Sequence, residues 1–172
     1  MNYSEIIPCD IANGEGVRVS LFVSGCSHHC PGCFNQDAQS YSFGNPYTPD
    51  TEAHIIDLLK PSYISGLSIL GGDPLCQDDM GLIVLNFLAR KVHELGKTVW
   101  LWTGDIWDDL DFKNYSLKSL LISACDVVVD GPFIEAKKDL SLVWKGSANQ
   151  RVIDVRKSIA SNKVILYEGE SQ

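Results

Sequence analysis

Three cysteines that fall within eight positions are the residues best suited to chemistry in this sequence. Cys26, Cys30 and Cys33 follow the spacing C-x3-C-x2-C, and the next cysteine along the chain is Cys76. Thiolates are the usual ligands of iron–sulfur centres, and a cluster that only transfers electrons normally has four of them. Three ligands leave one iron open to a substrate or cofactor, so the spacing favours a catalytic iron–sulfur cluster.

The same cysteines allow two other interpretations. A structural zinc ion could use the three thiolates together with His28 or His29, although zinc sites usually draw their ligands from two separated pairs and the sequence has no second pair. The Cys30-Pro-Gly-Cys33 tetrad also resembles a thioredoxin-type redox motif, which would leave Cys26 without a role. Outside a zinc site, we expect both histidines to be solvated loop residues.

Three further motifs each end a predicted strand. The first is Gly71-Gly72-Asp73-Pro74, which could be a plain turn. It could also be a ligand site, because glycines let a ligand approach the backbone closely. Beside a cysteine loop we favour the ligand site, in which backbone carbonyls, helped by Asp73, accept hydrogen bonds from a ligand ammonium group. The second motif is Trp102-Thr103-Gly104-Asp105. It can be explained as a core tryptophan followed by a turn, or as a site that contacts the ribose or adenine of a ligand. The third motif, Asp130-Gly131-Pro132-Phe133, has the composition of a turn.

The remaining cysteines and histidines are isolated in the sequence. Cys9, Cys76 and Cys125 are expected to be small buried hydrophobic residues. Cys76 closely follows the glycine motif and is the expected exception. His54 and His93 fall on predicted helices and are expected at the surface.

Strands and helices are predicted to alternate along the chain, and they must position these motifs. Apolar, β-branched runs predict strands at 17–23, 67–70, 98–102, 126–129 and 152–155. Helical spacing and caps predict helices from residue 48 or 50 to about 59, over 78–95 and around 116–123. Such alternation implies a mostly parallel α/β sheet, whose sites collect at the carboxyl ends of the strands. A closed barrel typically needs about 250 residues, so 172 residues favour a partial, open barrel of βα units or a smaller sheet.

Length and composition limit the class of protein. The 172 residues predict a single domain over 1–172, with a poorly specified tail after about 156. A net charge of −8 argues against a nucleic-acid partner, and no apolar run is long enough to span a membrane. Six cysteines without a secretory signal indicate a reducing, cytoplasmic location.

The C-x3-C-x2-C loop after a first strand resembles the radical S-adenosylmethionine superfamily. Seven segments in order are similar to one subfamily, the activating proteins of anaerobic ribonucleoside-triphosphate reductase: 10–16 (DIANGEG), 21–26 (LFVSGC), 30–35 (CPGCFN), 71–74 (GGDP), 102–104 (WTG), 129–133 (VDGPF) and 144–150 (WKGSANQ). Two positions depart from the superfamily. Gly32 stands where many members have an aromatic residue, and Asp73 replaces the usual glutamate of Gly-Gly-Glu-Pro.

The resemblance implies a cofactor and site residues. Cys26, Cys30 and Cys33 would bind three irons of a 4Fe-4S cluster, and S-adenosylmethionine would chelate the fourth iron. One electron would then cleave the cofactor to methionine and a 5′-deoxyadenosyl radical. No catalytic residue beyond the cluster and cofactor is implied. Residues implied to contact the cofactor are Gly32, Cys33, Phe34, Gly71, Gly72 and Asp73.

The resemblance also implies a partner. The chain would place a glycyl radical on anaerobic ribonucleoside-triphosphate reductase by abstracting a glycine hydrogen atom. A low-potential carrier such as flavodoxin would supply the electron. Two alternatives stay open: an activase of a formate-lyase-type enzyme, and a non-catalytic iron–sulfur or zinc protein.

Overall fold

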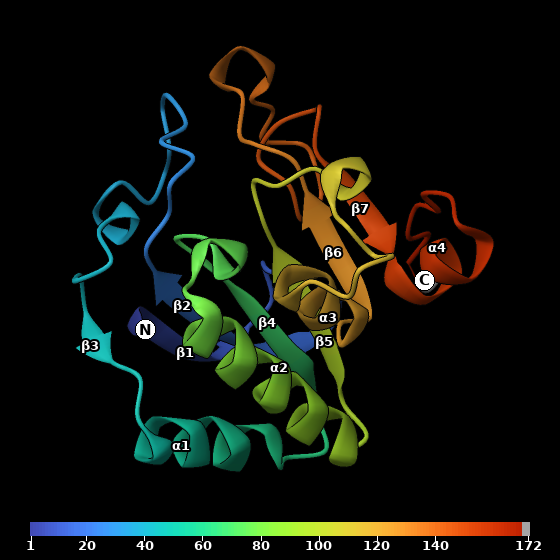
Figure 1. The fold of residues 1–172 in the computed structure, drawn as a ribbon. Helices are drawn as coiled ribbons and strands as arrows, with labels where there is room; N and C mark the ends of the chain where they lie inside the picture. The colour runs from blue at the N-terminus through green and yellow to red at the C-terminus, as the bar shows by residue number, and fades with distance from the viewer. Residues whose placement is uncertain (170–172) are drawn as a thin grey trace.

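The structure, a computed structural model, describes residues 1–169 and is built on one seven-stranded sheet (Figure 1). The strand order is β3-β1-β2-β4-β5-β6-β7. The strands are β1 (Asn2–Asp10), β2 (Val17–Ser24), β3 (Asn45–Pro46), β4 (Ile64–Gly71), β5 (Thr98–Trp102), β6 (Val127–Asp130) and β7 (Arg151–Asp154). Within the described residues the α-helices are α1 (Pro49–Leu59), α2 (Asp79–Glu94), α3 (Leu117–Ser123) and α4 (Val155–Ser161).

The sheet is parallel at its centre and antiparallel at both edges. Strands β2, β4, β5 and β6 run parallel to one another. Strands β1 and β3 continue the sheet antiparallel on one side, and β7 does so on the other. The α/β class and the parallel central strands are therefore confirmed. The partial barrel is not confirmed, because the strands form an open sheet with β3 and β7 at its edges.

Strand β1 was not predicted from the sequence. Its side chains are partly buried or exposed along most of its length, and its pairing with β2 contains two register shifts. An irregular edge region of this kind lacks the strict alternation by which a half-buried strand is identified.

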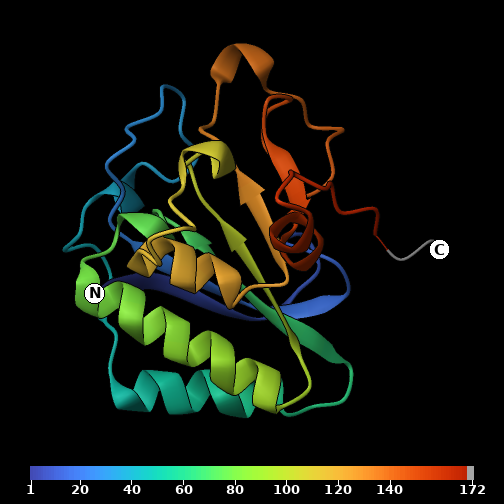
Figure 2. The same cartoon turned by 45° about the vertical axis from the view of Figure 1, so that its right-hand side comes forward.

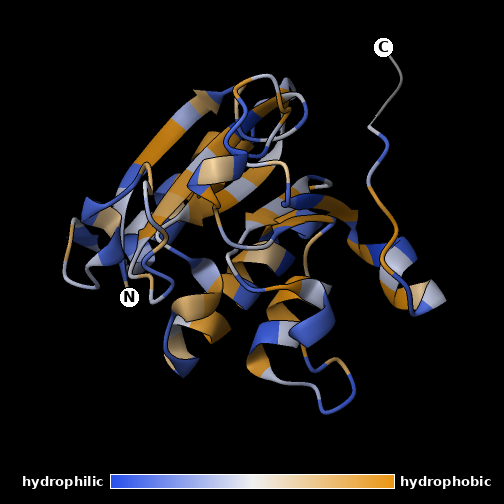
Figure 3. Cartoon of the chain, turned by 90° about the horizontal axis from the view of Figure 1, so that it is seen from above, coloured by the Kyte–Doolittle hydropathy of each residue, from blue (hydrophilic) through white to orange (hydrophobic). Residues whose placement is uncertain are grey.

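Helices α1, α2 and α3 lie together on one face of the sheet (Figure 2). The predicted inward face of α2 is confirmed, because Leu82, Leu85, Leu88 and Val92 are all buried. Viewed along the sheet from above, the strands carry much of the hydrophobic colour while each helix shows both colours (Figure 3). This layer of helices provides the hydrophobic core that holds the strand ends in place. In the part of the chain described, no helix is both long and apolar enough to cross a membrane.

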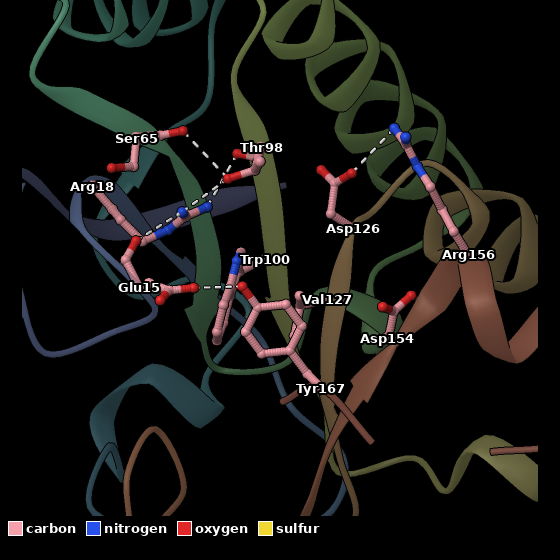
Figure 4. A pocket seen from close by; sticks show the side chains of 10 residues that line it. All are labelled: Glu15, Arg18, Ser65, Thr98, Trp100, Asp126, Val127, Asp154, Arg156 and Tyr167. Atoms are coloured by element: carbon pink, nitrogen blue, oxygen red, sulfur yellow. Dashed lines mark hydrogen bonds and ion pairs between the residues drawn. The ribbon is translucent and has the colours of Figure 1, made fainter. Parts of the chain in front are cut away.

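The other face of the central strands carries buried polar side chains, and Tyr167 of the C-terminal segment packs against Trp100 on it. Arg18 is 1% exposed and donates hydrogen bonds to Ser68 Oγ (2.8 Å) and to the Leu67 carbonyl (2.8 Å), while its guanidinium lies 5.4 Å from the Trp100 ring. A cavity of about 270 Å³ adjoins it at the amino ends of the parallel strands (Figure 4). Tyr167 lines part of this cavity and its ring lies 5.2 Å from the Trp100 ring, so the part of the C-terminal segment that the structure describes contacts the sheet.

Candidate functional site

The predicted motifs meet at one edge of the sheet, the carboxyl ends of the parallel strands. The loops after β2, β4, β5 and β6 surround an open cavity of about 550 Å³. In Figure 1 the loop after β2 and the segment 134–150 rise above this edge. The cavity is lined by all the residues predicted to bind metal or cofactor: Cys26, Cys30, Gly32, Cys33, Phe34, Gly71, Gly72 and Asp73. The tertiary structure therefore brings together residues that lie up to 47 positions apart, as 73 − 26 = 47.

The cysteine loop is fixed by its backbone. Gly25 has a φ of +104°, which favours glycine, and its N–H donates to the Ala38 carbonyl (2.7 Å). The Cys33 N–H donates to the Cys30 carbonyl (3.1 Å), which closes the predicted tight turn. All three thiols, including that of Cys26, are partly exposed, and no disulfide is present among the described residues. Free thiols on a preformed loop that face a cavity fit the donor set of an iron–sulfur cluster.

The glycine motif packs directly against this loop. The N–H of Gly72 donates to the Val23 carbonyl (2.7 Å). A Cβ atom added at Gly72 would lie 2.6 Å from the Gly25 carbonyl oxygen and 2.7 Å from the Ala38 carbonyl oxygen. Gly71 has a φ of +111° and its carbonyl accepts a hydrogen bond from Asn35. At Gly72 the missing side chain is thus required by the close approach of two protein backbones.

Asp73 is buried and ties together several strand ends. Its Oδ1 accepts a hydrogen bond from the Leu75 N–H (2.7 Å). Its Oδ2 accepts from the Thr103 hydroxyl (3.0 Å) and from the Gly104 N–H (2.7 Å). The residue is 1% exposed, so these bonds compensate for burying the carboxylate. Asp73 therefore connects the turns after β4 and β5.

His28 joins the same network, which corrects the prediction of a solvated loop residue. Its Nε2 lies 2.9 Å from Asp73 Oδ2 and 3.4 Å from Asp105 Oδ1, and 23% of its side chain is exposed. The contact with Asp73 raises the pKa of His28 above its ordinary value, and burial opposes that rise. Lys118 pairs with Asp105 at 2.6 Å and adds a further charge. His29 is exposed, as predicted.

The three isolated cysteines occupy different environments. Cys9 is exposed, so its predicted burial is wrong: it lies on the irregular edge region of β1. Cys125 is buried as predicted. Cys76, the predicted exception, is partly exposed and lies 3.2 Å from the Ser27 hydroxyl. Its contact with Cys26 lowers the pKa of the Cys76 thiol to about 6 and raises the pKa of the Cys26 thiol.

The geometry gives no support to a zinc ion held by the three loop cysteines. Among the described residues, the compact group of three potential ligands is Cys26, Asp73 and Cys76, which leaves out Cys30 and Cys33. Ligands of a single ion must lie close to one another. Thiolates on different irons of a cluster are further apart than thiolates on one ion, so the absence of Cys30 and Cys33 from this compact group does not argue against a cluster.

The segment 133–146 completes the cavity. Composition and residue spacing did not predict this contribution. Phe133, Leu140 and Trp144 line the cavity together with Phe34, which is 97% exposed. The indole of Trp102 donates to the Trp144 carbonyl (2.7 Å) and holds this segment above the end of β5. The motif around Trp144 was noted only through the family resemblance, because a loop gives no periodic signal.

Comparison with known proteins identifies relatives over almost the whole chain. A family model described as a 4Fe-4S single cluster domain matches residues 12–153. The anaerobic ribonucleoside-triphosphate reductase-activating protein of Pasteurella multocida is 44% identical over 153 residues, which cover 87% of this chain and 95% of the relative. The protein of the same name from Escherichia coli K12 is 40% identical, covering 91% of this chain and 100% of the relative.

A viral relative extends the comparison. The anaerobic ribonucleoside-triphosphate reductase-activating protein of Enterobacteria phage T4 is 37% identical over 155 residues, which cover 88% of this chain and 93% of the relative. Identity at this level across nearly full-length alignments, together with the match to the cluster domain, establishes descent from one ancestor. The chain belongs to the 4Fe-4S single cluster domain family and, within it, to the anaerobic ribonucleoside-triphosphate reductase-activating proteins.

Proposed function

We propose that this protein is a radical S-adenosylmethionine activase that generates a glycyl radical on anaerobic ribonucleoside-triphosphate reductase. One observation carries the proposal: three disulfide-free, partly exposed thiols line an open cavity together with the glycine motif. The names of the relatives, reductase-activating proteins, supply the partner.

Cys26, Cys30 and Cys33 would hold three irons of a 4Fe-4S cluster and leave the fourth iron free of protein ligands. When bound, the reduced cluster supplies the electron that cleaves S-adenosylmethionine to methionine and a 5′-deoxyadenosyl radical. The share of the chain is positioning and shielding. Its cysteine loop is held by Gly25 and by the turn at Cys33, so the thiols are oriented before a cluster is present.

The cofactor would lie between the cysteine loop and the ends of β4 and β5. A cavity of about 550 Å³ is within the usual size range of ligand pockets, roughly 300–1,000 Å³. We assign contacts with the cofactor to Gly32, Cys33 and Phe34 on one side and to the glycine motif on the other. We assign the ammonium group to backbone carbonyls of the glycine motif, helped by Asp73. The Asp73 carboxylate also accepts bonds from Leu75, Thr103 and Gly104 and so would hold the turn.

The open side of the cavity would receive a peptide loop of the reductase. Phe34 and Leu140 are 97% and 91% exposed and both line the cavity, so a partner that covers them would remove apolar surface from water. A low-potential carrier such as flavodoxin is proposed as the electron donor. A reducing compartment such as the cytoplasm suits the free thiols.

Anaerobic reconstitution tests the proposal. The reconstituted chain should contain about four irons and four sulfides. With a strong reductant and S-adenosylmethionine it should release methionine and 5′-deoxyadenosine. After addition of the reductase, electron paramagnetic resonance should detect a glycine-centred radical.

The same experiment separates the alternatives. A radical formed only on a formate-lyase-type partner would transfer the assignment to that activase class. A chain that takes up no iron even after any zinc has been removed with a chelator, or a cluster that never cleaves the cofactor, would show a non-catalytic metalloprotein.

A further inference from the structure

A second group of metal-binding atoms lies beside the cysteine loop and includes only one of its cysteines. One ligand atom each from Cys26, Asp73 and Cys76 lies within 4.8 Å of the other two. Cys30 and Cys33 are not in this group. Cys76 has no role in the proposed cluster, so its position next to Cys26 is not explained by that function.

The two loops that carry these atoms are fixed to each other. The Asp73 N–H donates to the Gly25 carbonyl (2.9 Å), which joins the backbones directly. The Gln77 amide, 7% exposed, donates to the carbonyls of Ser24 (3.1 Å) and Gly25 (3.3 Å). The Cys76 N–H donates to the Asp73 carbonyl (3.1 Å). Little of the site would need to be ordered when an ion binds.

The spacing suits one small ion. Zinc–thiolate bonds of about 2.3 Å place two sulfur ligands of a tetrahedral ion roughly 3.8 Å apart. The three atoms here lie within 4.8 Å of one another, so small rotations of the two cysteine side chains would bring the sulfur atoms to that separation while the hydrogen-bonded Asp73 carboxylate stays in place. Two thiols and one carboxylate select a borderline-soft ion such as Zn²⁺ over Mg²⁺ or Ca²⁺, which take oxygen ligands.

The same spacing argues against Cys76 as a fourth cluster ligand. In a four-iron cluster each cysteine binds a different iron, so the ligand sulfurs are held further apart than two sulfurs on a single ion. Cys26 cannot serve both arrangements at once. Occupation of this group and assembly of the cluster therefore exclude each other.

We propose that the cluster-free chain binds one Zn²⁺ ion through the thiolates of Cys26 and Cys76 and the carboxylate of Asp73, with water in the fourth position. Binding forms two zinc–sulfur bonds and releases the proton of each cysteine that is still protonated, with no change of oxidation state. The bound ion keeps Cys26 out of the cluster until the ion is removed. The group is a metal site of the immature protein that shares only Cys26 with the proposed cluster site.

Titration of the cluster-free, full-length chain with Co²⁺ and then Zn²⁺ under anaerobic, reducing conditions tests the site. One ion per chain should bind, and Co²⁺ should show thiolate charge-transfer absorption. Loss of an outer-shell partner alone typically costs 10–100-fold in affinity, so Cys76→Ser should weaken Zn²⁺ binding by more than about 100-fold. Cys30→Ser is the matched control and should leave Zn²⁺ affinity unchanged.

Two results would overturn the site. The first is no tight binding to the wild-type chain. The second is binding that survives Cys76→Ser but is lost in Cys30→Ser, which would place the ion in the three-cysteine loop. As a second readout, one equivalent of Zn²⁺ should delay iron uptake by the wild-type chain and not by Cys76→Ser. None of these measurements involves cofactor cleavage, so failure of the zinc site leaves the proposed activase function independently testable.

Discussion

At the scale of single residues, Asp73 connects the cysteine loop to the ends of two strands. It accepts bonds from Thr103 and Gly104, and His28 reaches it from between two of the cysteines. A carboxylate that is 1% exposed is costly unless it is fully paired. The network therefore stabilises the geometry of the cavity and links the cysteine loop to the rest of the fold.

The first residue-scale prediction concerns the cluster ligands. Cys26→Ala, Cys30→Ala and Cys33→Ala should each lose cluster iron or cofactor cleavage after anaerobic reconstitution, because each removes one thiolate. Cys9→Ala and Cys125→Ala should retain both, since Cys9 is exposed and Cys125 is buried in the core. Iron content and visible absorption provide the measurement. A Cys33→Ala protein with full iron and full cleavage would show that the ligand assignment is wrong.

The second residue-scale prediction concerns the pH dependence of stability. Asp73 raises the pKa of His28 above the ordinary value of about 6.5. The resulting stabilisation is fully present below that unfolded value and is lost as the pH rises through the higher folded value. His28→Ala should therefore destabilise the cluster-free chain more at pH 5.5 than at pH 8.5, by about 1 kcal/mol for a partly exposed pair.

Urea unfolding at both pH values measures this difference. His54→Ala is the control, because His54 lies exposed on α1 and should show no such pH dependence. An equal loss of stability at both pH values in His28→Ala would argue that His28 acts only by packing.

At the scale of elements, the parallel order of β2, β4, β5 and β6 brings the motifs to one edge. Each central strand is followed by a loop at the same end, because the connections return along one face of the sheet through α1, α2 and α3. The loop after β2 then packs on the loop after β4 through backbone atoms. The conformation of the cysteine loop therefore depends on the conformation of the glycine motif against which it packs.

Gly72→Ala tests this packing of loop on loop. The added Cβ would lie 2.6 Å from the Gly25 carbonyl oxygen, so the cysteine loop must shift. We expect reconstituted iron to fall, together with cofactor binding. Gly96→Ala is the control: its φ is +71° but no atom lies within 4 Å of the new Cβ, so it should lower stability and leave iron content unchanged. Full iron with lost cofactor binding in Gly72→Ala would indicate that the glycine instead makes room for the ligand.

At the scale of the whole molecule, one end of the sheet carries the candidate site and the other end contributes to stability. The carboxyl end holds the cysteine loop and the open cavity. The amino end is closed by Arg18 and by the C-terminal segment, where the Tyr167 ring lies 5.2 Å from the Trp100 ring and its hydroxyl bonds to Glu15 (Figure 4). Segments 152 positions apart thus hold this end together, away from the cavity.

Tyr167→Ala should therefore lower global stability without affecting the metal site. Loss of a partly buried aromatic side chain and its contacts should reduce the free energy of unfolding by about 2 kcal/mol. Tyr115→Ala, at a side chain that is 74% exposed, should change it by less than about 0.5 kcal/mol. Urea unfolding and iron content together check the prediction. A Tyr167→Ala chain with wild-type stability but without iron would contradict this separation of the stabilising end from the candidate site.

The sequence by itself determined the features that depend on near neighbours. Thr48, Asp78 and Ser116 begin α1, α2 and α3 because each side chain accepts a hydrogen bond from a backbone N–H three positions on. The buried stripe of α2 and the apolar central strands follow from periodicities of a few residues. The cysteine spacing likewise predicted an iron–sulfur cluster, which agrees with the match to a 4Fe-4S single cluster domain, because the three thiols are close in sequence.

Only the tertiary structure decided the features that depend on distant partners. His28 meets Asp73 across 45 positions, as 73 − 28 = 45, and Cys76 meets Cys26 across 50, as 76 − 26 = 50. The irregular strand β1 exists because β2 pairs with it, and the loop containing Trp144 closes the cavity because Trp102 holds it there. Such contacts leave no periodic or capping signal in the chain. Their energy depends on the parallel order of strands that brings the partners together, and that order is set by packing of the whole sheet.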